Sequence, residues 1–265
     1  MKKTAVKRVE SLVKGLAVIC AFNRNRPRMT LSETAKIVSL PRATARRLLH
    51  TLVELGYVET DGKLFQLSPR LLEVGYSYLG SLPWWEIAVP HMQKVSESLD
   101  ETCVASVLAG EDVVMIARRS GTRLTAINVP MGSRLPAHAT AMGRILIANQ
   151  GQTEIDRFVA ESTLRPITAH TVVDRKQLRK AIEFARDNDF SIVDQELEVG
   201  LLTVAVPIRD MQGNVLAAMA VSVHSSRATA KLLQQRHLPV LLKAVKEISA
   251  ALPTAASTER RLAYR

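Results

Sequence analysis

The sequence is poor in cysteine and has no metal-binding pattern. Its 265 residues contain only Cys20 and Cys103, with no CxxC pair and no His/Cys cluster at zinc spacing. A disulfide framework and a structural zinc site are therefore excluded, and we expect neither a metal nor a cofactor. Isolated cysteines fit a reducing compartment, so we expect a cytoplasmic protein.

Long apolar segments are also absent. The longest stretch without a charged residue is Met211–Ser226, which has 16 residues and is interrupted by polar ones. A membrane-spanning helix needs roughly 20 apolar residues. The N-terminus is basic, but Glu10, Lys14 and Arg24 occupy the place where a signal peptide would have its apolar region. We therefore expect no membrane segment and no export.

Common enzyme motifs are missing as well. The sequence contains no GxSxG, P-loop, GxGxxG or HExxH motif. Cys103 begins an apolar run without an evident histidine partner, so we interpret it as a buried hydrophobe rather than a nucleophile. For Asp194, Glu196 and Glu198, a solvated loop with one structural carboxylate is favoured over a metal site. We expect no enzymatic activity; the alternative is an enzyme that transforms a small acid and carries a basic appended module.

What the sequence does have is an uneven excess of positive charge. The net charge is +11, of which residues 1–82 carry +8 and residues 83–265 carry +3. With 47% hydrophobic residues the chain can bury a core, which excludes disordered and collagen-like classes. A basic N-terminal segment indicates a polyanionic partner, and the alternative is a charge that serves only solubility.

The first 68 residues predict a winged helix-turn-helix. Apolar periodicity, a Thr30/Glu33 capping box and helix-ending residues predict helices over Val6–Phe22, from Thr30 onward, and from Pro41 to Leu55. Asp61-Gly62 lies between two strand-like runs and predicts a hairpin with a two-residue turn. Three helices followed by such a hairpin form a DNA-binding module.

The third of these helices carries the candidate DNA contacts. Its apolar stripe comprises Ala45, Leu48, Leu49, Leu52 and Leu55. Arginine matches the O6 and N7 atoms of guanine with two hydrogen bonds, and small side chains permit close approach. A solvated charged face is the alternative. We predict DNA contacts by Arg42, Ala43, Thr44, Arg46 and Arg47 on the helix and by Lys63 at the hairpin tip.

The remaining residues predict a linker helix over 69–82 and an α+β domain over 83–252. The break at residues 80–83 precedes Trp84 and Trp85, which either relay a signal across the hinge or fill the local core. Residues 253–265 have no apolar period and predict a mobile tail. In the second domain we expect helices over 84–99, 138–149, 152–160, 174–188 and 228–252, and strands over 102–108, 113–119, 124–129, 191–193, 202–209 and 215–223.

One helix start in this domain is a candidate anion site. Free N–H groups near residues 139–144 bind anions, and Arg134 and Arg144 add positive charge for a small carboxylate. A helix packed by small residues explains the pattern equally well. Thr203, Ser222 and His224 interrupt apolar runs, so each is either a hydrogen-bonded core group or a polar point in a ligand pocket.

Several segments together resemble the IclR family of bacterial transcription regulators, over about residues 6–250. The resemblance is greatest to the branch that controls aromatic-acid catabolism through the β-ketoadipate pathway. It rests on residues 26–31, 42–49, 54–58, 61–65, 81–84, 132–137, 142–144 and 193–198. It implies a winged helix-turn-helix domain, a linker helix and a GAF-like effector-binding domain, in a homodimer or homotetramer on double-stranded operator DNA. The N-terminal region is implied to take part in dimerisation.

The resemblance also implies the effector site. Family pockets use backbone N–H groups at the positions of Ala141 and Met142, and Val193 and Ala220 stand where a glyoxylate-type relative has polar residues, which favours a less polar, ring-bearing ligand. The expected effector-binding residues are Arg134, Thr140, Ala141, Met142, Val193, Thr203, Ala220 and Ser222. We expect a regulator of aromatic-acid catabolism, an activator rather than a repressor, controlled by a small aromatic or dicarboxylic acid. The alternative is an IclR-type repressor that responds to a different small acid.

Overall fold

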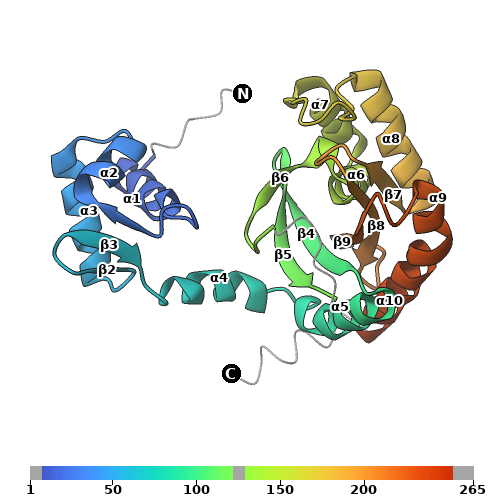
Figure 1. Ribbon diagram of the computed structural model, residues 1–265, viewed down its shortest axis with the longest axis horizontal. Coiled ribbons are helices and arrows are strands. Elements are labelled where there is room, and N and C mark those ends of the chain that lie inside the picture. Colours follow the sequence, from blue (N-terminus) through green and yellow to red (C-terminus); the bar gives the residue numbers. More distant parts are fainter. Residues whose placement is uncertain (1–7, 122–128, 253–265) are drawn as a thin grey trace. The chain divides into compact units, whose positions relative to one another are not determined.

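The computed structural model describes residues 8–121 and 129–252, and the chain divides into two compact units, Met1–Ser81 and Leu82–Arg265 (Figure 1). The predicted tail at 253–265 and nearly all of the strand expected at 124–129 lie outside the described residues. Within those residues, every helix is too short or too polar to cross a bilayer.

The N-terminal unit combines helices with a small antiparallel sheet. Its elements are α1 (Glu10–Ala21), β1 (Arg28–Thr30), α2 (Leu31–Ile37), α3 (Arg42–Glu54), β2 (Val58–Thr60), β3 (Leu64–Leu67) and α4 (Leu71–Gly80). Val18, Leu49 and Phe65 bring α1, α3 and the sheet together in one buried apolar cluster. Thr30 accepts the N–H of Glu33, whose carboxylate accepts the N–H of Thr30, so the predicted capping box is confirmed.

Two local predictions for this unit are wrong, and one strand was missed. Strand β1 was not expected, yet it pairs with β3 and buries Met29 opposite Phe65. The hairpin turn is longer than two residues, because Thr60 pairs with Phe65 and the carboxylate of Asp61 accepts the N–H groups of Lys63 and Leu64. Leu55, assigned to the apolar stripe, is 51% exposed because α3 ends at Glu54.

The C-terminal unit has one six-stranded antiparallel sheet in the order β6-β5-β4-β9-β8-β7. Its strands are β4 (Thr102–Ala109), β5 (Asp112–Arg119), β6 (Arg134–Pro136), β7 (Ser191–Asp194), β8 (Leu201–Arg209) and β9 (Val215–His224). Its α-helices are α5 (Trp85–Leu99), α6 (Ala141–Ala148), α7 (Gln152–Glu161), α8 (Arg175–Asn188), α9 (Ala230–Leu232) and α10 (Leu238–Ala251).

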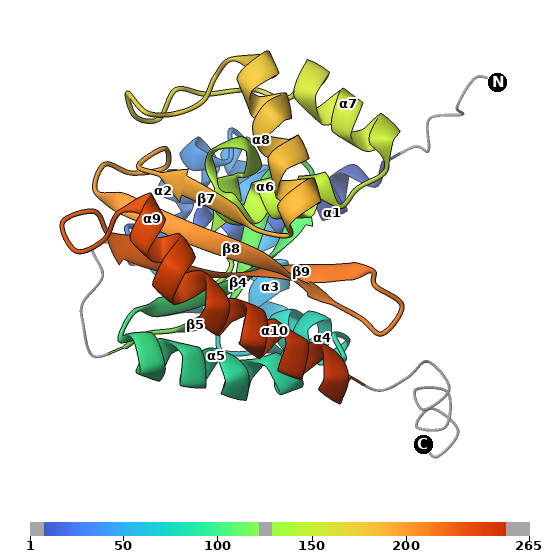
Figure 2. The same cartoon turned by 90° about the vertical axis from the view of Figure 1, so that its right-hand side faces the viewer.

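Helices cover both faces of this sheet. Figure 2 shows α6, α7 and α8 on one side of the strands and α5 and α10 on the other. Strands β8 and β9 are therefore buried on both faces, which explains their nearly continuous apolar sequences. The apolar core on the α6 side includes Met115, Ile145, Leu178 and Ala220.

Two predicted helices of this unit are interrupted. The helix expected over 138–149 is a 3-10 turn, η1 (Ala137–Ala139), followed by α6, whose N-cap is Thr140. The helix expected over 228–252 contains a π-helical segment, η2 (Leu233–His237), between α9 and α10. Pro239 follows this segment and has no N–H to donate, so a change in the hydrogen-bond register is tolerated there.

The two tryptophans belong to the C-terminal unit. Trp84 is only 2% exposed, and the indole N–H of Trp85 donates to the carbonyl oxygen of Ile116 at 3.4 Å. Both rings therefore have partners inside this unit, which favours the interpretation that they fill the local core over the one that they relay a signal.

Candidate DNA-binding face and effector cavity

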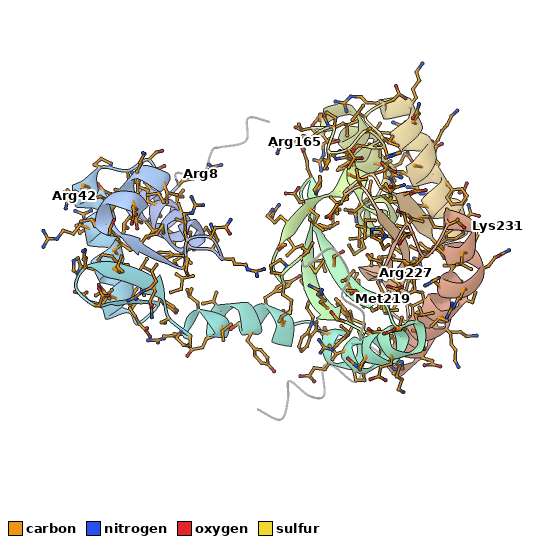
Figure 3. The ribbon with its side chains drawn as sticks, viewed as in Figure 1. Arg8, Arg42, Arg165, Met219, Arg227 and Lys231 are labelled. Atoms are coloured by element: carbon orange, nitrogen blue, oxygen red, sulfur yellow. The ribbon has the colours of Figure 1, made fainter. Side chains whose placement is uncertain are left out.

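Helix α3 presents an arginine-rich face to solvent. Ala45, Leu49 and Leu52 are buried, whereas Arg42, Ala43, Arg46 and Arg47 are exposed and Thr44 is half-buried. Within the described residues none of the three guanidinium groups takes part in an ion pair or hydrogen bond. Figure 3 shows Arg42 projecting away from its unit. The face can therefore donate hydrogen bonds to an acceptor-rich partner without first breaking internal contacts.

The hairpin tip offers a second basic point. Lys63 is exposed, and the neighbouring Asp61 accepts a hydrogen bond from the guanidinium of Arg28 at 2.8 Å. Hydrogen bonds from the backbone of Leu64 and Lys63 hold the pKa of Asp61 below its usual value. The carboxylate therefore stays charged, and it fixes the turn that carries Lys63.

A narrow cavity lies between α6 and the sheet of the C-terminal unit. Its volume is about 40 Å³, where one water molecule needs roughly 10–15 Å³ by the same measure. A ring-bearing ligand must therefore widen it. The lining is mainly apolar and consists of Thr102, Val104, Met115, Arg118, Val129, Leu135, Ala139, Thr140, Ala141, Met142, Val193, Leu197, Leu201, Thr203 and Ser222.

Three hydroxyl groups form a row across this cavity. The strand register pairs Thr203 with Ser222 and Ser222 with Thr102, so the three residues share one face of β8, β9 and β4. The hydroxyls of Thr203 and Ser222 are 3.0 Å apart and hydrogen-bonded. We call these residues the hydroxyl row. It is the polar strip of an otherwise apolar wall, and it can donate to or accept from a ligand hydroxyl.

The first turn of α6 closes the cavity from the other side. The Thr140 hydroxyl caps the helix by accepting the N–H of Gly143 at 3.0 Å, and Ala141 and Met142 line the cavity. Gly143 lies against the η1 turn: a Cβ placed on it would fall 2.6 Å from the carbonyl carbon of Ala137. Only glycine permits this approach of the helix to the turn that precedes it.

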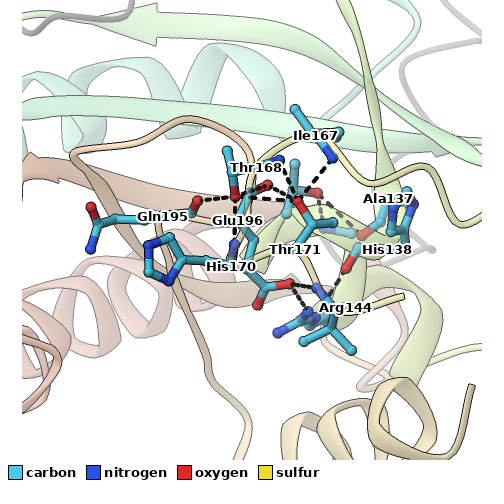
Figure 4. A network of polar contacts seen from close by, with 12 residues as sticks. Ala137, His138, Arg144, Ile167, Thr168, His170, Thr171, Gln195 and Glu196 are labelled. Carbon is cyan, nitrogen blue, oxygen red and sulfur yellow. Dashed lines mark hydrogen bonds and ion pairs between the residues drawn. The ribbon is translucent and has the colours of Figure 1, made fainter. Parts of the chain in front are cut away.

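A buried ion pair braces the cavity walls (Figure 4). The guanidinium of Arg144 donates to Glu196 at 2.6 Å, and both side chains are at least nine-tenths buried. Glu196 also accepts the N–H of Val172 at 2.9 Å, while its carbonyl oxygen accepts the hydroxyl of Thr171 at 2.7 Å. Segments 137–144, 165–172 and 195–201 are thereby tied together, and the first and last of them line the cavity.

His138 adds a further link in this brace. Its Nε2 lies 3.1 Å from the carbonyl oxygen of Arg165, and the guanidinium of Arg144 donates to the His138 carbonyl oxygen at 3.2 Å. Burial lowers the pKa of the imidazole, so the ring is neutral at pH 7 and its N–H serves as a hydrogen-bond donor. The residue is structural and does not line the cavity.

The structure brings most of the sequence-predicted effector residues together. Those that line the cavity are Thr140, Ala141, Met142, Val193, Thr203 and Ser222. Ala220 lies beneath them in the apolar cluster. Arg134 is not part of the site: it is exposed on β6, where it donates to Asp112 at 3.0 Å and to the Ala109 carbonyl oxygen at 2.7 Å. Arg144, also considered for charge, is engaged with Glu196.

The sequence interpretation missed several cavity residues, among them Thr102 of the hydroxyl row and Arg118. Among the residues that the structure describes, Arg118 is the charged one in the lining, and it follows the run 113–117 of β5. Adjacent Arg118 and Arg119 point to opposite faces of the sheet, and only the strand register decides which of them faces the cavity. Arg118 pairs with Val104, whose side chain lines the cavity, so Arg118 lies on the cavity face of the sheet. This assignment needs the pairing with β4, and the sequence around Arg118 alone does not give it.

The other residues considered have structural roles. Cys103 is fully buried, and burial raises the pKa of its thiol far above the usual value. Glu196 is the one structural carboxylate of its loop, and the described residues contain no His, Cys or carboxylate group suited to a metal ion. The Nδ1 atom of His224 contacts the Ser226 hydroxyl at 2.7 Å, which makes it a turn residue.

Known proteins match the chain in both units. The IclR helix-turn-helix domain matches residues 11–62, and the C-terminal domain of the bacterial transcriptional regulator IclR matches residues 76–250. The Pca regulon regulatory protein of Pseudomonas putida is 40% identical over 239 residues, which are 90% of this chain and 82% of that protein.

Two further relatives cover nearly the same span. The p-hydroxybenzoate hydroxylase transcriptional activator of Acinetobacter baylyi is 29% identical over 91% of this chain and 90% of its own. An IclR homologue from Microbacterium hydrocarbonoxydans, crystallised with 4-hydroxybenzoate, is 25% identical and superposes with a TM-score of 0.81 over 91% of this chain and 98% of its own. The chain therefore belongs to the IclR family of bacterial transcriptional regulators.

Proposed function

We propose that this chain binds operator DNA and activates genes for the breakdown of aromatic acids, with such an acid as its effector. The observation that carries the proposal is the apolar cavity with its hydroxyl row, in a chain whose relatives regulate Pca and p-hydroxybenzoate genes. Activation follows the Acinetobacter relative's description. A repressor that responds to another small acid is the second candidate. The position of the operator relative to the promoter, and not the protein itself, determines whether binding activates or represses transcription.

The α3 face supports the DNA-binding part of this proposal. Arg42, Arg46 and Arg47 extend from one exposed side of a helix that follows a short helix and a turn, with small Ala43 and Thr44 between them. This is how a recognition helix presents donors to the major groove. Lys63 at the hairpin tip contacts a phosphate or the minor groove.

We expect Arg46→Ala to weaken binding to the preferred duplex by about 1–3 kcal/mol if Arg46 contacts a base edge. The loss is then confined to sequences that carry that base. A phosphate contact instead weakens all sequences alike and lowers the salt slope by about 1. The measurement is selection from a randomised duplex library with the full chain, followed by titration at several salt concentrations.

Lys243→Ala, an equal change of charge on α10, is the control and leaves binding unchanged. The DNA-binding proposal fails if the wild-type chain selects no sequence from the library, or if Arg42, Arg46 and Arg47 variants all bind as the wild type does.

The cavity supports binding of an aromatic acid. Its walls come from Val104, Met115, Val193 and Leu197, which suit a ring, and the first turn of α6 supplies N–H donors for an anionic group. None of its lining residues within 8–121 and 129–252 is a histidine, lysine or carboxylate. The described lining therefore offers no general base beside the hydroxyls, which supports binding and release of the ligand without chemical conversion.

Protocatechuate, 4-hydroxybenzoate or β-ketoadipate is expected to raise the unfolding temperature of the full chain. At a concentration 100 times its dissociation constant, a ligand stabilises the folded state by about 2.7 kcal/mol. A thermal-shift screen of these acids, with glyoxylate and a sugar acid in parallel, is the direct measurement. A response to glyoxylate alone contradicts the aromatic-acid proposal and moves the protein to another branch of the family.

Exposed apolar faces support assembly into a homodimer or homotetramer. In α1, Val9, Leu12 and Leu16 are each more than half exposed, and in α4 the structure buries no residue. Side chains of this kind are stabilised by a partner. Light scattering at micromolar concentration tests this part of the proposal, since a monomer would contradict it. A cytoplasmic location remains a prediction.

A further inference from the structure

We propose that Arg118 recognises the carboxylate of the effector and that Thr203 and Ser222 of the hydroxyl row receive a ring hydroxyl at the other end of the cavity, on β8 and β9. This assignment rests on the proposed function, because it states which residues of that same cavity bind each end of the ligand. It replaces Arg134, which the sequence indicated and which the structure places elsewhere, on Asp112.

The composition of the lining carries the first step. A carboxylate that leaves water for an apolar cavity loses several kcal/mol of hydration unless charged or well-oriented donors replace the water. Arg118 is the one charged residue among the lining residues that the structure describes. A guanidinium presents a planar pair of N–H donors that fits the two oxygens of a carboxylate, and such charge-assisted bonds are about twice as strong as neutral ones.

The position of the guanidinium carries the second step. Its Nη1 donates to the carbonyl oxygen of Val129 at 3.4 Å, and Val129 itself lines the cavity. Arg118 is half-buried, so the group sits at the edge of the cavity rather than in the core. At 3.4 Å the contact is long for a hydrogen bond, and a carboxylate at 2.7–2.9 Å is a better acceptor than this carbonyl oxygen.

The strand order carries the third step. Arg118 pairs with Val104 on β4, Val104 pairs with Ala220 on β9, and Ala220 pairs with Ala205 on β8, two residues along that strand from Thr203. Three strand spacings, roughly 14 Å, therefore separate the strand of Arg118 from the strand of Thr203. The long Arg118 side chain occupies part of this span. The remainder suits a ring that carries an acid at one end and a hydroxyl at the other.

The hydroxyl row suits a neutral ligand group better than an anion. The hydroxyls of Thr203 and Ser222 already bond to each other at 3.0 Å, so a phenol can join the pair as donor to one and acceptor from the other. In the described part of the lining, the cation nearest in strand order to Thr203 and Ser222 is Arg118, which lies on the more distant strand β5. We therefore place the carboxylate of the ligand at the Arg118 end of the cavity and its ring hydroxyl at Thr203 and Ser222.

The test compares an acid with its neutral amide on the full chain. Calorimetric titration with 4-hydroxybenzoate and 4-hydroxybenzamide gives an acid-to-amide affinity ratio for the wild type and for Arg118→Met, Arg118→Lys and Arg119→Met. We expect Arg118→Met to weaken binding of the acid about 10- to 150-fold while binding of the amide stays unchanged. Arg118→Lys restores part of the ratio, because it keeps the charge but loses the planar pair of donors.

Arg119→Met is the matched control. Arg119 has the same charge on the same strand, pairs with Cys103 on the opposite face, and donates to the Arg118 carbonyl oxygen at 2.7 Å. It is expected to keep the wild-type acid-to-amide ratio. Circular dichroism melting of each variant shows whether the fold is retained, and the ratio itself is insensitive to a uniform loss of folded protein.

The opposite end of the ligand is tested by Thr203→Val. This substitution is expected to lower the preference for 4-hydroxybenzoate over benzoate about 2- to 12-fold while leaving the acid-to-amide ratio unchanged. If Thr203→Val lowers the acid-to-amide ratio instead, the ligand lies the other way round and the proposal is overturned. It is also overturned if Arg118→Met keeps the wild-type ratio, since the first turn of α6 then holds the carboxylate alone.

A failure of the proposed function gives a different result from a failure of the Arg118 proposal. If the wild type binds glyoxylate or a dicarboxylate and no aromatic acid, the function is wrong. The role of Arg118 is then decided by the same acid-to-amide comparison on the acid that does bind: a collapse of the ratio in Arg118→Met supports it, and an unchanged ratio contradicts it.

Discussion

Glu196→Ala is expected to lower the free energy of unfolding of the C-terminal unit by about 3–5 kcal/mol, because it leaves the Arg144 guanidinium buried without its carboxylate. The same substitution removes the acceptor for the N–H of Val172. Arg144→Met has a comparable effect, since Glu196 then remains charged and buried. Urea unfolding followed by tryptophan fluorescence is the measurement. The chain's two tryptophans, Trp84 and Trp85, both lie in this unit and report on it selectively.

The double variant Arg144→Met/Glu196→Ala separates charge from packing. With both partners replaced by apolar side chains, no charge is left buried, and we expect most of the lost stability to return. If the double variant is as unstable as the sum of the two single ones, the pair acts through packing and hydrogen bonds to the backbone, and not through its charges. Arg179→Met, which removes an exposed ion pair with Asp156, is the matched control and costs less than about 1 kcal/mol.

The arginine face of α3 was predictable from the sequence because its signals are local. Periodicity places Ala45, Leu49 and Leu52 on the buried side of the helix, and the arginines must then lie on the other. The same holds for the capping box at Thr30. Which residues share one side of a helix follows from their spacing over a few residues, so the sequence alone is sufficient to predict the exposed side of α3.

The cavity was only partly predictable because its walls depend on strand register. The resemblance to the family indicated Thr203 and Ser222, and the register brings them together with Thr102. Nothing local distinguishes Arg118, which lines the cavity, from Arg119, which does not. Arg134 was chosen because it is near α6 in the sequence. In the structure β6 pairs with β5, which places Arg134 beside Asp112, to which it donates a hydrogen bond.

The backbone irregularities escaped prediction for a related reason. Strand β1 is three residues long and exists because β3, more than thirty residues further along the chain, supplies its hydrogen bonds. The η1 turn likewise takes its shape from contact with Gly143 and from the N–H of Ala137, which donates to the Glu111 carbonyl oxygen at 2.9 Å. Contacts of this range are made only in the folded chain, so sequence periodicity does not report them.

Gly143→Ala is expected to destabilise the C-terminal unit by about 3 kcal/mol, near the upper end for overpacking, and to abolish the effector-induced thermal shift. The added methyl group meets the backbone of Ala137, including its carbonyl carbon at 2.6 Å, and a backbone cannot swing aside as a side chain can. Either α6 or the η1 turn must move, and Ala139, Thr140 and Ala141 line the cavity from there.

Gly75→Ala is the matched control for this substitution. Gly75 lies inside α4 with no atom within 4 Å of the added methyl group, so alanine is tolerated and favours the helix by up to about 1 kcal/mol. Thermal unfolding and the effector screen, run on both variants beside the wild type, decide the matter. Because helix propensity alone predicts that both substitutions stabilise, a Gly143→Ala protein with wild-type stability and a full effector response would show that the approach of α6 to η1 is not what shapes the cavity.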